Sequence, residues 1–231
     1  MKRTIQSTVI LLALLFAGSF YSQEISAQEV RELEPFEEIG IAVRADVFYT
    51  QGNGHQIKIE GRSQDVEDLI TEVENGLLRI RHENYRLRRE KLTIYITSEE
   101  LESVKISGSA KFMAENPVTS EEMEIAVSGS GGVMFDRLSS EEVEAKISGS
   151  GSVELAGRAE EMETMISGSG KIMAEDFEVS ECSAVISGSG SCTVAVKDEL
   201  DAKISGSGNV YYKGDPEINS VSSGSGSVRS L

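Results

Sequence analysis

Two cysteines and two histidines are the residues of this chain best suited to nucleophilic catalysis. A cysteine nucleophile needs a histidine beside it for activation, yet Cys182 and Cys192 lie far along the chain from His55 and His82. Both cysteines occupy mainly apolar positions of a sequence repeat, which favours two buried free thiols. A disulfide between them is the alternative, because the chain is expected to be exported.

Acidic residues recur in pairs, at 121–122, 141–142, 160–161, 175–176 and 198–199. Calcium could bridge such carboxylates if they stack, but the Gly-Gly-x-Gly-x-Asp calcium repeat is absent from the sequence. We therefore expect solvated carboxylates along one side of the molecule, and neither a metal nor another cofactor.

Six cations gather in one short run: Arg79, Arg81, Arg86, Arg88, Arg89 and Lys91. Such a run is typical of a solvated hairpin and its strand ends. The alternative is a patch for an anionic ligand, such as lipopolysaccharide or an acidic glycan, with Arg86, Arg88 and Arg89 as contacts.

An internal repeat must position these residues. The motif Ser-Gly-Ser-Gly, once Ser-Gly-Ser-Ala, begins at residues 107, 128, 148, 167, 187, 205 and 223, and 13 of the 22 glycines lie within it. Apolar and polar residues alternate between the motifs, which indicates β-strands with one buried face. This alternation argues against a disordered Gly/Ser linker.

The spacing of the motifs, 18 to 21 residues, predicts the fold. About 20 residues at about 3.3 Å each give a perimeter of roughly 66 Å. We predict coils of three short strands, stacked as a parallel β-solenoid with about seven coils. Both glycines of each motif are expected to point inward at a corner, and both serines outward.

One outward column of the predicted solenoid is unusually apolar. Six residues after the first Ser of the motif stand Met113, Met134, Met173 and Tyr211. An exposed apolar strip can mark contact with a partner. Burial under an adjacent loop is the alternative.

Residues 1–27 have the pattern of a secretory signal peptide. A basic start precedes an apolar run over 9–17, and Ser19 and Ala27 offer cleavage sites. We expect export to the periplasm, the outer surface or the extracellular space, and no membrane span in the mature chain.

Residues 28–231 are predicted as one β-helix domain, irregular over 28–100 and regular over 101–231. The irregular part contains β-rich segments at 41–43, 47–49, 56–60, 77–81 and 92–96.

Two local signals stand between these segments. Asn75-Gly76 predicts a hairpin turn, and residues 63–70 a short helix. We expect the irregular part to cover the first coil. The other end has no evident cap, so self-association through coil ends is a further hypothesis.

Four segments and the repeat together resemble a known family. The segments are Phe36–Ile39, Ala45–Gly52, Gly76–Ile80 and Leu92–Ile96, and the repeat is the iterated Ile-Ser-Gly-Ser-Gly. Over about residues 36 to 228 the chain is similar to the family described as putative auto-transporter adhesin, head GIN domain. This resemblance implies a right-handed, single-stranded parallel β-helix at the bacterial envelope or surface. It transfers no catalytic or ligand-binding residue.

These observations predict a non-enzymatic, adhesin-like module that binds a glycan or an envelope or surface protein. The alternative is a polysaccharide-acting β-helix enzyme, a lyase or a hydrolase. Catalysis would need an isolated acidic pair in a cleft, whereas no repeat departs sharply from its neighbours and the chain lacks Trp. With 39 acidic and 22 basic residues, nucleic acid is not an expected partner.

Overall fold

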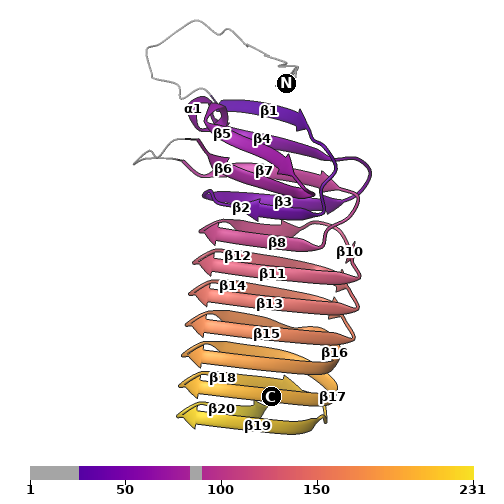
Figure 1. Cartoon of the computed structure of the whole chain (residues 1–231), viewed down its shortest axis with the longest axis vertical. Helices are drawn as coiled ribbons and strands as arrows, with labels where there is room; N and C mark the ends of the chain where they lie inside the picture. Colours follow the sequence, from indigo (N-terminus) through magenta and orange to yellow (C-terminus); the bar gives the residue numbers. More distant parts are fainter. Residues whose placement is uncertain (1–25, 84–89) are drawn as a thin grey trace, which may run out of the picture.

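The computed structural model describes residues 26–83 and 90–231, which form a single rod of stacked strands (Figure 1). The predicted signal peptide, apart from its last two residues, and the arginines at 86, 88 and 89 lie outside these ranges. Within them, no helix is long and apolar enough to cross a membrane.

The fold is a parallel β-solenoid of about six turns, which the seven motifs delimit. Two walls of parallel strands run along the rod. The first wall contains the strands that end in the Ser-Gly of each motif: β8 (Ser103–Gly108), β11 (Glu122–Gly129), β13 (Glu142–Gly149), β15 (Glu161–Gly168) and β19 (Glu217–Gly224). Register along this wall places Ser128 beside Ser148 and Gly129 beside Gly149, as the repeat predicts.

The second wall contains the strands that follow each motif: β9 (Lys111–Ala114), β12 (Gly132–Ser139), β14 (Ser152–Arg158), β18 (Asn209–Lys213) and β20 (Ser227–Ser230). The long strands β16 (Lys171–Gly188) and β17 (Ser191–Gly206) begin in this wall and end in the first wall. The short strand β10 (Val118–Thr119) pairs with the end of β12.

The prediction of three short strands per coil holds for the first coil, where β8, β9 and β10 are separate strands. It is wrong for the coils that contain β12, β14, β16 and β17, because there the second and third sides belong to one bent strand. In β12 the register shifts between Phe135 and Leu138. Both of these side chains are buried, whereas Asp136 and Arg137 between them are exposed. A bulge of this kind restarts the alternation and turns the strand without ending it.

The two glycines of each motif differ, which corrects the expectation that both point inward. Gly149, the first of its motif, is partly exposed and has a φ of 122°. A Cβ there would lie 2.6 Å from the carbonyl oxygen of Gly129 in the coil before. Gly151, the second, is buried, and its Cβ would lie 2.5 Å from Val127 Cγ1. The first glycine therefore makes the turn, and the second gives room to a core side chain.

A continuous core fills the rod and joins its irregular and regular parts. Tyr49 stacks on Phe112 with ring centroids 5.6 Å apart, and Phe112 lies 5.6 Å from Phe135. Burial of the apolar columns supplies the main driving force for closing the coils.

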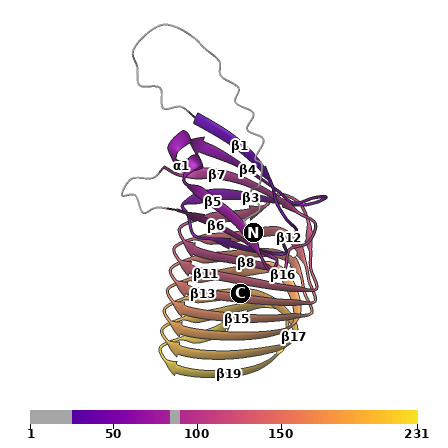
Figure 2. The ribbon, with the colours of Figure 1, turned by 45° about the horizontal axis from the view of Figure 1, so that its top comes forward.

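The irregular part, which we call the cap, comprises residues 26–100. Its strands are β1 (Ser26–Glu32), β2 (Glu38–Ile41), β3 (Ala45–Gln51), β4 (Gln56–Arg62), β5 (Leu69–Glu74), β6 (Leu77–His82) and β7 (Leu92–Ser98). Strands β2 and β3 continue the two walls in parallel with β8 and β9, whereas β4 is antiparallel to β7 and β1 is antiparallel to β4. The cap thus closes the N-terminal end of the rod, as Figure 2 shows.

The local predictions for the cap are largely confirmed. Strands β5 and β6 form an antiparallel hairpin through Asn75 and Gly76, whose φ values of 52° and 79° suit a tight turn. The helix α1 (Ser63–Glu67) is shorter than the predicted 63–70, because Leu69 already pairs in β5.

Candidate functional site

The second wall carries a continuous outward column of side chains, which we call the outward strip. Strand register places its members side by side from the cap to the last coil. In order along the rod they are Lys58, Tyr95, Phe48, Met113, Met134, Glu154, Met173, Thr193, Tyr211 and Arg229. The four residues from Tyr95 to Met134 form its uninterrupted apolar part.

Two aromatic rings of the strip, those of Phe48 and Tyr95, are packed face to face along the rod. Phe48 and Tyr95 stack with centroids 5.3 Å apart and an interplanar angle of 21°. Lys58 Nζ lies 4.9 Å from the centroid of the Tyr95 ring. Both faces of Tyr95 are therefore covered, and its edge is what remains for a partner.

Only part of this strip was predicted from the sequence. Met113, Met134, Met173 and Tyr211 do share one outward column, and Met173 is 37 % exposed. The other three are partly exposed, so the strip stays at the surface rather than under a loop. Phe48 and Tyr95 were missed, because the cap does not follow the repeat spacing. The alternation in Val47–Tyr49 and Ile94–Ile96 is consistent with outward side chains at Phe48 and Tyr95, but it contains no information on their register with Met113.

The first wall carries two ladders of carboxylates on its outer surface. Parallel register stacks Glu122, Glu142, Glu161, Glu181, Glu199 and Glu217 in one ladder. Beside it stand Glu124, Glu144, Glu163 and, after Ser183, Asp201. Neighbours in such a ladder are about 4.8 Å apart, so this wall is strongly negative.

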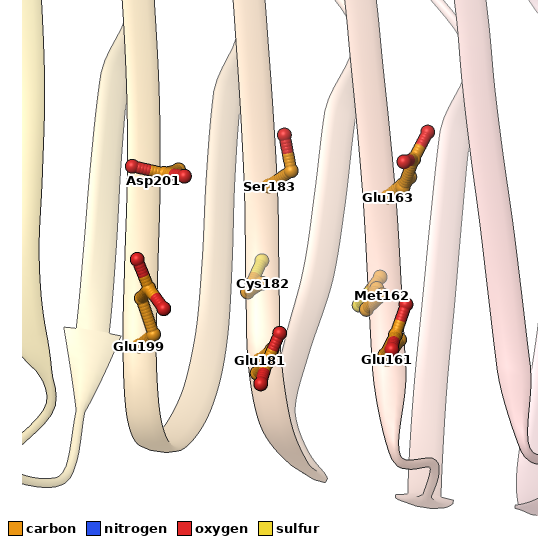
Figure 3. A pocket seen from close by; sticks show the side chains of 8 residues that line it. All are labelled: Glu161, Met162, Glu163, Glu181, Cys182, Ser183, Glu199 and Asp201. Atoms are coloured by element: carbon orange, nitrogen blue, oxygen red, sulfur yellow. The ribbon is translucent and has the colours of Figure 1, made fainter.

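A shallow groove lies between the ladders toward the C-terminal end (Figure 3). It is lined by Glu161, Glu163, Glu181, Glu199 and Asp201, together with Ser183 and the buried Met162 and Cys182. Along the described part of the chain these five carboxylates form no ion pair, and no group of three or more acidic, Cys or His residues is placed to hold a metal ion.

The acidic pair at 175–176 does not join these ladders, which corrects its place in the predicted acidic side. Asp176 pairs in register with Ala156 of β14, on a different part of the coil. Lys213 Nζ lies 3.7 Å from Asp176 Oδ1 and 3.9 Å from Glu175 Oε2.

The basic run is only partly described. Arg79 and Arg81 form ion pairs with Glu74 and Glu72 across the β5–β6 hairpin, at 2.7 and 3.0 Å. Lys91 Nζ lies 2.6 Å from Asp46 Oδ2. Its described members thus have carboxylate partners within the cap.

Comparison with known proteins agrees with this geometry. The family model for the putative auto-transporter adhesin, head GIN domain matches residues 35–216. The chain belongs to this family. A comparison with curated proteins found no match.

Solved structures share the fold of this GIN domain. A putative adhesin from Bacteroides fragilis NCTC 9343 superposes with a TM-score of 0.86 at 23 % identity, covering 90 % of this chain and 98 % of the other. A putative adhesin from Parabacteroides merdae ATCC 43184 superposes with a TM-score of 0.75 at 25 % sequence identity, covering 90 % of this chain and 97 % of the other. A putative lipid binding protein from Parabacteroides distasonis ATCC 8503 superposes with a TM-score of 0.76 at 25 % sequence identity, covering 90 % of this chain and 98 % of the other.

The cysteines of the GIN domain are buried free thiols, as predicted. Burial raises the pKa of Cys192 to about 12, against a lowering contribution from the Thr164 hydroxyl 3.9 Å away. Burial also raises the pKa of Cys182, and the neighbouring Cys192 adds to that effect. A nucleophilic thiol needs the opposite shift. His55 packs on Phe36 in the cap, with ring centroids 5.3 Å apart.

Proposed function

We propose that this GIN domain is a non-enzymatic, exported module of the bacterial cell envelope or surface that binds a protein partner through the outward strip. Family membership supports a surface or exported, adhesin-like protein. The secretory pattern of residues 1–27 supports export.

The observation that carries this proposal is the continuous apolar part of the strip, Tyr95, Phe48, Met113 and Met134, on a flat sheet face. Side chains of this kind are enriched where proteins contact one another, because flexible Met and large aromatic residues bury much surface on docking. Sugar recognition uses exposed ring faces, whereas Phe48 and Lys58 cover those of Tyr95. A protein partner therefore fits this strip better than a glycan.

The carboxylates support a binding role over catalysis. General acid and base catalysis needs two carboxyl groups in different environments, so that one is protonated and the other ionised. In the first wall the same carboxylate recurs from coil to coil, as from Glu142 to Glu161 and Glu181. Such uniform ladders offer no distinct acid and base.

A photo-crosslinking residue placed at Met134 tests the proposal on bacterial cells that export the chain. We expect an adduct with an envelope protein. The matched control carries the crosslinker at Val185, which is also partly exposed but lies on the first wall. Equal adducts at both positions, or specific glycan or lipid-vesicle binding lost on Met134→Glu, would overturn the choice of a protein partner. Depolymerisation of a polysaccharide by the purified chain would overturn the non-enzymatic role.

A further inference from the structure

The methionines of the outward strip are bordered by charged side chains of their own strands. The sequence around Met113 is Lys-Phe-Met-Ala-Glu, and the sequence around Met173 is Lys-Ile-Met-Ala-Glu. Met134 is followed two residues later by Asp136. Because side chains two residues apart point to the same face of a strand, and these strands are parallel and in register, the strip has a basic border on one side and an acidic border on the other.

The charges of both borders are available to a partner. The basic border contains Lys111 and Lys171, the acidic border contains Glu115 and Asp136, and all four residues are exposed. Glu115 continues the wall beyond β9, since its backbone N donates to the carbonyl oxygen of Tyr49 at 2.8 Å. Within residues 26–83 and 90–231, none of the four border residues forms an ion pair with another side chain.

The sheet beneath the strip has no free strand edge. Strand β9 pairs with β3 on one side and with β12 on the other, and β12 pairs in turn with β14. Their backbone groups are used within the wall, so a partner cannot add a strand to the sheet at this place. It must instead lie across the outward side chains.

The spacing of the two borders suits an α-helix. Lys111 and Glu115 are four residues apart on extended backbone, which separates their Cα atoms by about 13 Å. An α-helix with its side chains is about 10–12 Å across, so one helix laid along the rod fills the space between the borders. Neighbouring coils are about 4.8 Å apart and a helical turn rises about 5.4 Å, whereas like-facing side chains of an extended segment are about 6.6 Å apart. The helix is therefore the better match along the strip as well.

We propose that the protein partner docks an amphipathic α-helix on the outward strip, with its apolar face on the methionines, acidic side chains along the basic border and basic side chains along the acidic border. This inference rests on the proposed function and specifies the partner's binding element. The two unlike borders fix the direction of the helix, because turning it end to end sets like charges opposite each other on both sides. Glu154 lies between Met134 and Met173 in the strip, and a basic residue of the helix fits opposite it.

Photo-crosslinkers placed at Met113 and at Met173, in separate variants on exporting cells, test the helix. Register puts the two positions three coils apart, which is about 14 Å. Mass spectrometry of the adducts should find partner residues about ten apart in one segment, since a helix rises about 1.5 Å per residue. Adducts about four residues apart would indicate an extended segment, and adducts on separate segments a folded surface. Either result would overturn the proposal.

Charge reversal tests the borders. Lys111→Glu together with Lys171→Glu makes both borders acidic, so the yield of adduct through a crosslinker at Met134 should fall by about tenfold. Lys146→Glu together with Lys203→Glu is the matched control, because it changes the net charge equally but lies on the first wall. Thermal unfolding checks that both variants are folded, and the crosslink spacing provides the test if either is not.

The outcomes separate this inference from the proposed function. A protein adduct at Met134 whose yield is unchanged by charge reversal at Lys111 and Lys171, or is lowered equally by the control, would overturn the docked helix and leave the protein partner standing. If the unreversed chain gives no protein adduct at Met134, both proposals fall.

Discussion

The cap and the coils share one core but are held together by different means. In the cap, individual side chains join strands: Arg31 of β1 bonds to Leu69 and Thr71 of β5, and the buried hydroxyls of Tyr49 in β3 and Ser98 in β7 lie 2.9 Å apart. In the coils, identical backbone corners stack, as where Ser169 N donates to the carbonyl oxygen of Gly149 at 2.8 Å. The cap therefore depends on individual side chains, and the coils on residues that have none.

The largest effect that separates the two regions is expected at the first glycine of the motif. Gly149→Ala adds a Cβ at positive φ and brings it to 2.6 Å from the carbonyl oxygen of Gly129. Strain of this kind costs on the order of 1–3 kcal/mol, and the contact with fixed backbone adds about 1–2 kcal/mol. Urea unfolding should show a loss of about 2–5 kcal/mol in the free energy of unfolding.

Gly108→Ala is the matched control, because it lies in the first motif, where no earlier motif stacks beneath it. Its φ is 128°, yet a Cβ there meets no atom within 4 Å. We expect only the conformational cost, about 1–3 kcal/mol. Equal losses for the two variants would show that stacked corners do not govern the stability of the coils.

Alkaline pH should destabilise both regions, because the cap buries the hydroxyl of Tyr49 and the coils bury the thiols of Cys192 and Cys182. Burial raises the pKa of Tyr49 in the cap to about 12, against a lowering contribution from Ser98, and raises that of Cys192 in the coils to about 12. Each group stays neutral in the folded chain at a pH where it ionises in the unfolded chain. The contribution of each group to the free energy of unfolding is complete below the pKa that the group has in the unfolded chain, and it is lost as the pH rises to about 12. The loss is about 2–4 kcal/mol per group.

Thermal unfolding between pH 8 and pH 12 measures this loss. With Tyr49→Phe, the melting temperature should fall less steeply with pH above about pH 10. With Cys192→Val, it should fall less steeply from about pH 9. Valine suits the cysteine position, because Val153 and Val210 occupy the same column. An unchanged pH profile in either variant would assign the alkaline loss to other groups.

The same contrast explains what the sequence could predict. In the coils, adding one repeat length carries a residue to its stacked neighbour, so Met113 and Met134 were placed together correctly. In the cap, no constant spacing links Phe48 to Tyr95 or to Met113, and only strand pairing joins them. The bend in β12 was also missed, since alternation does not reveal that Asp136 and Arg137 are both outward.

The smallest expected loss of folding stability concerns the ion pairs at the boundary between the two regions. Lys105 Nζ in β8 lies 2.7 Å from a carboxylate oxygen of Glu124 in the first full coil and 3.2 Å from one of Glu38 in the cap. The hydrogen bond to Glu124 is the main cause that raises the pKa of Lys105. Because its side chain is 42 % exposed, water screens both pairs. Lys105→Met should cost no more than about 1 kcal/mol.

Lys146→Met provides the comparison, because Lys146 pairs only with Glu144 of its own strand β13 among the described residues and joins no two regions. We expect a smaller loss there, and both losses should shrink in concentrated salt, which screens exposed charges. A cap that unfolds separately in Lys105→Met, seen as a second transition in calorimetry, would mean that this lysine couples the two regions. A single transition with a small shift would instead assign the coupling to the core, through Tyr49 and Phe112.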